Sequence, residues 1–201
     1  RVRPDRPTES QQLLFDRMRT YLTKESLAYR PVLLVGSVAV GKTWLARYVV
    51  RQFGGNYVNI ATDCFTELLR YSSLPKVPPE DVAKLVQKYS RQQPAGPVFV
   101  DGLDAILTAI AAGQRSGILE NFFSTMRRTR NLPHPTVMII QLNRYLTESA
   151  LKKSNWWNEE DCYVLNLTLQ DRRIIAENWQ VVPAVADQAE TALEIVFSRM
   201  M

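Results

Sequence analysis

The chain has 201 residues, 46% of them hydrophobic and 22% charged, with a formal net charge of +5 at pH 7. These values are typical of a globular protein with room for one α/β domain, and they exclude large-scale disorder and disfavour two full domains. Its only cysteines and histidine, Cys64, Cys162 and His134, argue against a disulfide framework, a zinc site and Ser-His-Asp or Cys-His catalysis. No apolar run approaches the length of a membrane span, and the positive charge favours an anionic partner such as RNA.

The first predicted element is a helix that follows residues 8–10. Its apolar residues recur at helical spacing, and the sequence Tyr-Arg-Pro at 29–31 ends it. The apolar side consists of Leu13, Leu14, Met18, Tyr21 and Leu22. We expect this helix to cover an edge of a sheet.

A phosphate-binding loop is predicted at residues 36–43. The apolar run 32–35 predicts a buried strand before it, and helical spacing from Trp44 onward predicts a helix that ends at residues 54–55. The loop fits G-x-x-x-x-G-K-[ST] and reads Gly36-Ser37-Val38-Ala39-Val40-Gly41-Lys42-Thr43. In this motif backbone N–H groups face nucleotide phosphates, the lysine reaches the outer phosphates and the threonine hydroxyl ligates Mg²⁺. We therefore assign residues 36–43 and Trp44 to nucleotide binding, and Thr43 also to the metal.

Residues 56–60 predict a second strand, and residues 80–93 predict a helix after a proline-rich interruption. Between them Asp63 is expected to cap a helix that presents Phe65, Leu68 and Leu69 on one face.

A second informative stretch is the strand predicted over residues 97–101, which ends in Asp101. A hydrophobic strand ending in an acid downstream of the phosphate loop is the Walker B arrangement, in which the carboxylate holds Mg²⁺ through its water shell. Many P-loop ATPases carry a further acid directly after this aspartate to orient the attacking water, but here that position is Gly102. Asp104 is the nearby substitute for that catalytic role, and equally a candidate cap for the helix predicted over residues 105–112.

Residues 136–141 predict a fourth strand. In this fold class a polar sensor of the γ-phosphate often follows that strand, so Asn143 or Arg144 can read the nucleotide state, and either is equally a loop residue. The helix predicted before it, over residues 114–130, ends in three arginines that can clamp RNA phosphate or simply suit a helix C-terminus. These are Arg127, Arg128 and Arg130.

The polar insert 151–161 contains the adjacent Trp156 and Trp157. They are interpreted as a contact surface, or as one ring that closes the core from outside. Residues 162–167 then predict a strand, residues 168–171 open a helix, and residues 187–201 predict a last helix. Together these elements predict an α/β P-loop NTPase core of the AAA+/STAND-like type at 31–169, with a parallel sheet between helices. An N-terminal helix and arm at 1–30 precede it, and a short helical C-terminal lid at 170–201 follows.

Three stretches carry a resemblance to a known family. They are the loop 36–43, the segment Asp-Gly-Leu-Asp-Ala-Ile-Leu at 101–107, and the segment 171–180 with its Asn178-Trp179 pair. They resemble the death-associated protein three family, the P-loop proteins of the mitochondrial ribosome's small subunit. The resemblance implies that Gly36, Gly41, Lys42, Thr43 and Asp101 hold GTP or GDP and Mg²⁺ as part of the architecture. It also implies a mitochondrial location, with ribosomal RNA and small-subunit proteins as partners.

The segment 101–104 is equally similar to the Walker B of STAND and AAA+ ATPases, including small P-loop components of phage-defence systems. This resemblance implies a cytoplasmic ATP-driven switch that forms homo-oligomers, with Arg144 as a sensor arginine. The candidate arginine fingers are Arg127, Arg128 and Arg172. Because no Asn-Lys-x-Asp motif for guanine follows the fourth strand, the sequence leaves GTP, GDP and ATP open. We expect slow or absent hydrolysis, because Gly102 removes the usual water-orienting acid.

Overall fold

A computed structural model describes residues 6–37, 39–68, 70, 71, 73, 76–92, 96–113, 117–141 and 147–172. The chain divides into two compact units, Leu13–Asn166 on the one hand and Arg1–Gln12 with Leu167–Met201 on the other. Of the second unit, residues 6–12 and 167–172 are described. None of the helices in the described part of the chain combines the length and apolar character needed to cross a bilayer.

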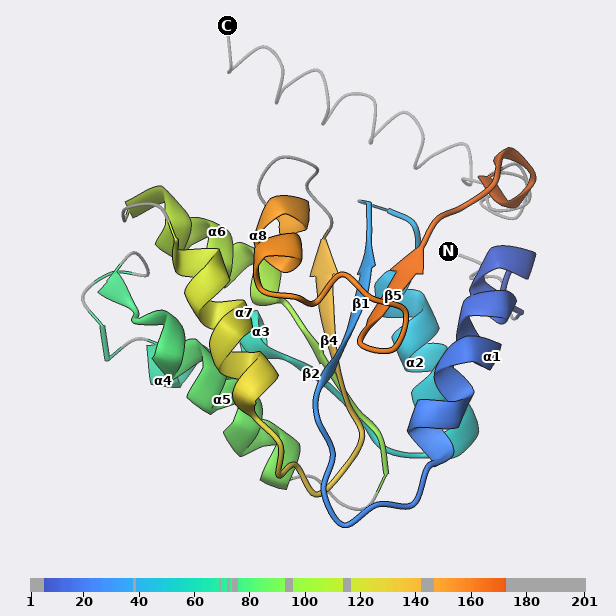
Figure 1. The fold of residues 1–201 in the computed structure, drawn as a ribbon, viewed down its shortest axis with the longest axis horizontal. Helices are drawn as coiled ribbons and strands as arrows, with labels where there is room; N and C mark the ends of the chain where they lie inside the picture. The colour runs from blue at the N-terminus through green and yellow to red at the C-terminus, as the bar shows by residue number, and fades with distance from the viewer. Residues whose placement is uncertain are drawn as a thin grey trace, which may run out of the picture. The chain divides into compact units, whose positions relative to one another are not determined.

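The larger unit is built on a five-stranded parallel sheet (Figure 1). In space the strands follow the order β2-β3-β4-β1-β5. Their bounds are β1 Val32–Gly36, β2 Asn56–Asn59, β3 Val98–Asp101, β4 Thr136–Gln141 and β5 Cys162–Leu165. Because the strands are parallel, the glycine loop after β1 and Asp101 at the end of β3 lie at the same edge of the sheet, with β4 between them.

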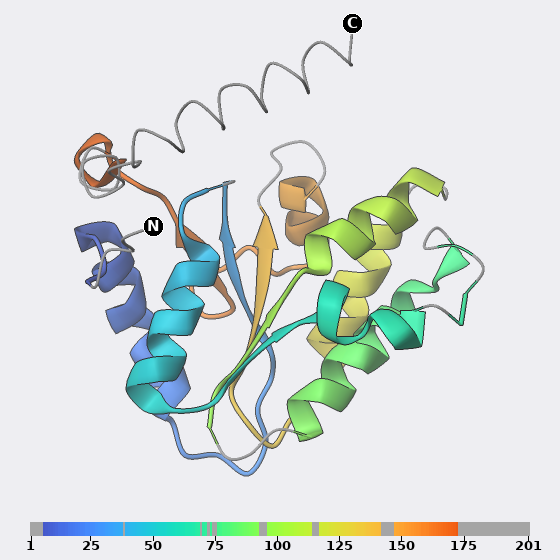
Figure 2. The ribbon, with the colours of Figure 1, turned by 180° about the vertical axis from the view of Figure 1, so that it is seen from behind.

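Helices cover both faces of this sheet (Figure 1 and Figure 2). On one face lies α2 (Lys42–Phe53), and on the other lie α5 (Pro79–Gln92), α6 (Leu103–Gly113) and α7 (Ile118–Arg128). The N-terminal helix α1 (Glu9–Thr23) packs beside α2 through Phe15, whose ring centroid is 6.2 Å from that of Tyr48 and 5.5 Å from that of Phe53. The short helices are α3 (Ile60–Asp63), α4 (Phe65–Leu68) and α8 (Thr147–Lys153). With both faces covered a strand can be apolar throughout, and all five residues of β1 are buried.

All five predicted strands are confirmed, with ends that differ by at most two residues. The helices predicted near residues 80–93, 105–112 and 114–130 correspond to α5, α6 and α7, although residues 114–116 lie outside the described part. The α/β fold with a parallel sheet between helices is therefore confirmed. The last helix predicted over residues 187–201 lies outside the described residues.

Two local predictions were wrong. Leu13 is 61% exposed, because the buried stripe of α1 runs through residues 14, 18 and 22, and Leu13 lies about 100° away from it around the helix. Asp63 does not start a helix but ends α3: its carboxylate accepts a hydrogen bond from the N–H of Asn59 at 2.8 Å, while the Asn59 side chain accepts one from the N–H of Ala61 at 3.1 Å. This reciprocal pairing caps the N-terminus of α3.

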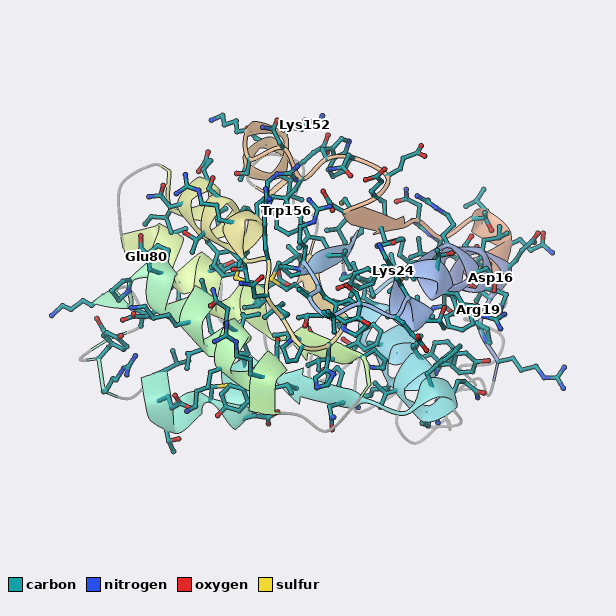
Figure 3. The ribbon with its side chains drawn as sticks, turned by 60° about the horizontal axis from the view of Figure 1, so that its bottom comes forward. Asp16, Arg19, Lys24, Glu80, Lys152 and Trp156 are labelled. Carbon is teal, nitrogen blue, oxygen red and sulfur yellow. The ribbon has the colours of Figure 1, made fainter. Side chains whose placement is uncertain are left out.

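The tryptophan pair divides between two roles. Trp156 is 1% exposed, and its indole N–H donates to the carbonyl of Phe123 at 2.8 Å, so this ring closes the core as the second interpretation had it. Trp157 is 37% exposed, and its role as a contact surface stays a prediction. The sequence analysis missed α8, which precedes the pair; Figure 3 labels Lys152 of this helix together with Trp156. On α1, in contrast, labelled side chains such as Asp16 and Arg19 are exposed.

In the second unit Thr168 and Asp171 form a reciprocal cap for a helix that begins at residue 169, as predicted. The N–H of Thr168 donates to the Asp171 carboxylate at 2.8 Å, and the N–H of Asp171 donates to the Thr168 hydroxyl at 3.1 Å. The hydroxyl of Ser10 donates to the same carboxylate. These bonds join Ser10, in the first turn of α1, to Asp171.

Candidate functional site

The loop between β1 and α2 has the backbone geometry of a phosphate-binding loop. Two of its residues have left-handed backbone angles, with φ of 61° at Ala39 and 86° at Gly41. A Cβ on Gly36 would lie 2.7 Å from the carbonyl oxygen of Leu165, so only glycine fits where the loop leaves β1. Gly41 caps α2 without a side-chain hydrogen bond, and so the first N–H groups of the helix are left for an anion.

Lys42 lies inside this loop. Lys42 is 9% exposed, and its ammonium donates to the carbonyl oxygens of Gly36 at 2.8 Å and Ser37 at 2.7 Å. Burial lowers the pKa of Lys42, while the carboxylates of Asp104 and Asp101 act in the opposite direction. A cation held against the loop by carbonyl groups can exchange those weak partners for phosphate oxygens.

Thr43 and Asp101, 58 positions apart in the sequence, meet at the edge of the sheet. The Thr43 hydroxyl donates to Asp101 Oδ2 at 2.6 Å, and the N–H of Gly102 donates to Asp101 Oδ1 at 2.7 Å. A hydroxyl and a carboxylate are oxygen donors of the kind that Mg²⁺ prefers. Within the described residues no group of three or more His, Cys, Asp and Glu side chains gathers.

Tyr57 is a member of the site that the sequence analysis missed. Its hydroxyl donates to Asp101 Oδ2 at 2.7 Å, the oxygen that Thr43 also contacts. Burial raises the pKa of Tyr57 to about 12, and the hydrogen bond to Asp101 adds to this. Tyr57 stands two residues before Asn59, which is in register with Asp101, but the sequence alone does not reveal that β2 and β3 are neighbours.

Gly102 occupies the position at which many P-loop ATPases carry the acid that orients the attacking water. Its φ is +77°, and a Cβ built on it would lie 2.2 Å from Asn59 Oδ1 and 3.0 Å from the N–H nitrogen of Ala61. An L-residue is strained at this φ, and the crowding adds to the cost. A side chain at this position would therefore strain the backbone and require the Asn59 side chain to move, so glycine is favoured here.

Asp104 lies in the first turn of α6 and is bound to a different element. Both of its carboxylate oxygens accept from the N–H of Gln141 at the end of β4, at 2.7 and 2.9 Å. Burial raises the pKa of Asp104, while the N–H of Gln141 and the charge of Lys42 counteract this. The interpretation as a simple helix cap therefore leaves out the bond that ties Asp104 to the end of β4.

The remaining predicted site residues are less informative. Trp44 stacks on Tyr48, with ring centroids 5.3 Å apart and an interplanar angle of 14°. Arg127 pairs with Asp161 at 3.1 Å, which makes it a poor arginine finger. Val38, Asn143 and Arg144 lie outside the described residues. Val40 is buried, and Arg128, Arg130 and Arg172 are exposed.

A parallel sheet of this order, with a glycine loop and lysine after β1 and an aspartate at the end of β3, defines a P-loop NTPase. Residues 32–154 match the family described as "ATPase family associated with various cellular activities (AAA)". Because this match covers more than half of the sequence, the chain belongs to the AAA family. It is thus a nucleotide-binding P-loop protein.

Among solved structures, NtrX from Brucella abortus, crystallised in complex with ATP, is similar at 11% sequence identity and a TM-score of 0.36. The likeness covers 83% of this chain and 37% of the NtrX chain, so the chain spans little more than a third of that protein. A likeness this weak adds nothing to the family assignment. Among curated proteins, no relative matches the sequence.

Proposed function

We propose that this protein is a small AAA ATPase that binds Mg²⁺-ATP as a conformational ligand, hydrolyses it slowly, and acts as a switch between nucleotide states. The observation that carries the proposal is the contrast at the end of β3. Asp101 is held by three hydrogen-bond donors, whereas a side chain at the next position would be strained and would displace Asn59. These contacts support a site that binds phosphate and metal but has glycine where the usual water-orienting acid stands.

Each binding residue has a distinct task in this proposal. The first-turn N–H groups of α2 and the ammonium of Lys42 take up the negative charge of the phosphates. The Thr43 hydroxyl and the Asp101 carboxylate hold the metal ion and its water shell. Mg²⁺, when bound, neutralises charge on the phosphates.

Asp104 is the group proposed to hold the attacking water. A carboxylate fixed by a main-chain N–H of β4 keeps its place when the loop binds phosphate, and its raised pKa makes it a better proton acceptor than an ordinary aspartate. Because Asp104 stands two positions beyond the usual acid, we expect turnover below about one per second, the lower end of common enzyme rates.

Assembly into homo-oligomers is part of the proposal. An exposed arginine from a neighbouring copy would supply positive charge at the phosphates, and Arg128 and Arg172 are exposed. Arg127 is engaged with Asp161 in its own subunit.

The ribosomal role in mitochondria, with bound GTP or GDP, stays a prediction from resemblance. The family match favours an adenine nucleotide, and the segment 171–180 that carries much of the resemblance lies mostly beyond the described residues. The AAA switch is therefore the better supported function.

Calorimetry with ATP and GTP, each with Mg²⁺ or with EDTA, tests the proposal together with a turnover assay and light scattering. We expect ATP to bind more tightly than GTP, turnover below about one per second, and larger assemblies with ATP than without nucleotide. Failure to bind ATP, or brisk turnover by isolated subunits, would contradict it. Preference for GTP together with sedimentation on small ribosomal subunits would support the ribosomal role instead.

A further inference from the structure

The Asp101 carboxylate is held unevenly. Oδ2 accepts from two hydroxyl groups, Thr43 at 2.6 Å and Tyr57 at 2.7 Å. Within the described residues Oδ1 has one donor, the N–H of Gly102 at 2.7 Å. A carboxylate oxygen has two lone pairs in its plane, so Oδ2 is saturated and the free lone pair lies on Oδ1.

Tyr57 is itself held in place. The guanidinium of Arg47 lies 4.6 Å from the centroid of its ring, and Arg47 stands one helical turn after Thr43 on α2. The hydroxyl is thus fixed by a ring contact from α2 and by its bond to β3. A chain of contacts runs from Arg47 through Tyr57 and Asp101 back to Thr43 on the same helix.

The Thr43 bond alone does not fix the carboxylate. In the arrangement proposed above, the Thr43 oxygen is also a metal ligand, so its position depends on the bound nucleotide. The Tyr57 hydroxyl comes from β2, within the sheet, and is not itself a proposed ligand of the metal or the nucleotide. Groups of this kind, which orient a metal-binding side chain from behind, commonly change metal affinity 10- to 100-fold when removed.

We propose that Tyr57 is a positioning residue for the magnesium aspartate. Its hydroxyl occupies Oδ2 and leaves Oδ1 for the metal-bound water, so that nucleotide binding becomes strongly dependent on Mg²⁺. The inference rests on the proposed binding of Mg²⁺-ATP. It concerns the metal dependence of that binding, and it does not require turnover.

The test compares Tyr57→Phe with the unaltered protein and a matched control. Calorimetry gives the dissociation constant of a non-hydrolysable ATP analogue in EDTA and in saturating Mg²⁺, and the ratio of the two constants measures the metal's contribution. In Tyr57→Phe we expect the EDTA value to stay within about twofold and the ratio to fall about tenfold. When Mn²⁺ replaces Mg²⁺, the electron paramagnetic resonance signal of the bound metal should be broader and weaker in Tyr57→Phe than in the unaltered protein.

The control is Tyr89→Phe, which also removes a tyrosine bond to a carboxylate, that of Glu67 at 2.9 Å, away from the loop. It should leave the ratio unchanged. In an Asp101→Asn background, Tyr57→Phe should add no further loss, because its effect passes through that carboxylate. Melting temperatures of all variants show whether folding is intact.

An unchanged ratio in Tyr57→Phe would overturn the inference, as would a loss that adds fully to that of Asp101→Asn. If the unaltered protein binds no nucleotide in either buffer, the proposed function fails first and the inference with it. If the unaltered protein binds and Tyr57→Phe shows the same metal dependence, the function stands and the inference alone fails.

Discussion

Asp104 and Asp171 are both acids in the first turn of a helix, but their surroundings shift their pKa values in opposite directions. Burial raises the pKa of Asp104, and the N–H of Gln141 and the charge of Lys42 only partly offset this. At Asp171 burial also acts to raise the pKa, but donors from Ser10 and Thr168 outweigh it and bring the value down to about 2. Those donors are two hydroxyl groups and two N–H groups.

Among the described residues, the donors therefore differ between the two carboxylates. The donors at Asp171 favour its ionised form, and its bonds serve structure. Asp104 has a raised proton affinity beside Lys42, which suits a group that handles a water molecule. This difference separates a structural acid from a candidate catalytic one on physical grounds.

The largest expected effect tests the proposed catalytic role of Asp104. Asp104→Asn should lower single-turnover hydrolysis of ATP about 100-fold, because general-base catalysis commonly contributes that much or more. Its affinity for Mg²⁺-ATP should stay within about threefold, because Asp104 is not proposed to bind phosphate or metal. Asp171→Asn should turn over ATP at the unaltered rate. If Asp104→Asn hydrolyses normally, the contact with Gln141 serves only to join α6 to β4.

A second prediction concerns Lys42, the cation of the phosphate-binding loop. Lys42→Ala should weaken ATP binding about 10- to 100-fold, since a hydrogen bond to a charged group is worth about 1.5–3 kcal/mol. It should also raise the pKa of Asp104 further, because Lys42 helps to hold that carboxylate ionised. Titration of ATP by calorimetry measures the loss. Lys88→Ala, which removes an ion pair with Glu67, is the control, and equal losses in both variants would place the ligand elsewhere.

A third prediction asks why the acid stands at position 104 and not at 102. Gly102→Ala should lower the free energy of unfolding by about 2 kcal/mol, from the strained φ and the contact with Asn59. Gly117 also has a left-handed backbone, with φ of +105°, and a Cβ there meets nothing within 4 Å. Gly117→Ala should therefore cost only about 1 kcal/mol, the strain alone. Urea denaturation measures both.

Asn59→Ala provides the control for the crowding, because it removes the oxygen 2.2 Å from the added Cβ. In this background the cost of Gly102→Ala should approach that of Gly117→Ala. Equal costs for both glycine variants in the unaltered background would show that position 102 tolerates a side chain, and the absent acid would then need another explanation.

The parts of the site that sequence predicts are those whose geometry is local. The loop, Lys42 and Thr43 are contiguous, and Asp101 follows directly from its strand. Tyr57 and Gln141 could not be assigned in this way, because their roles depend on which strands are neighbours and on register across the sheet. The crowding at Gly102 likewise comes from Asn59, on the strand next to it.

The same limit applies to the fold. Periodicity located the strands and most helices, because each is a repeating local pattern. It misplaced Leu13 and left the role of Trp156 open, because burial depends on which elements pack against a side chain. Residue spacing shows which side chains share a face, but not what covers it.

The last prediction concerns Asp171 and its dependence on pH. An unfolded aspartate has a pKa of about 3.9, whereas donors from Ser10 and Thr168 hold the pKa of Asp171 at about 2 in the folded chain. A folded pKa below the unfolded one stabilises the protein above the unfolded pKa, and the stabilisation is lost as pH falls from about 4 to about 2. Asp171→Asn cannot ionise, so its melting temperature should lie below that of the unaltered protein at pH 6, with the gap closing toward pH 2. Asp104→Asn should show no such closing gap, because the pKa of Asp104 is raised. A gap for Asp171→Asn that is the same at every pH would mean that its bonds hold the neutral acid as well as the anion, and the distinction between the two aspartates would then rest on Asp104 alone.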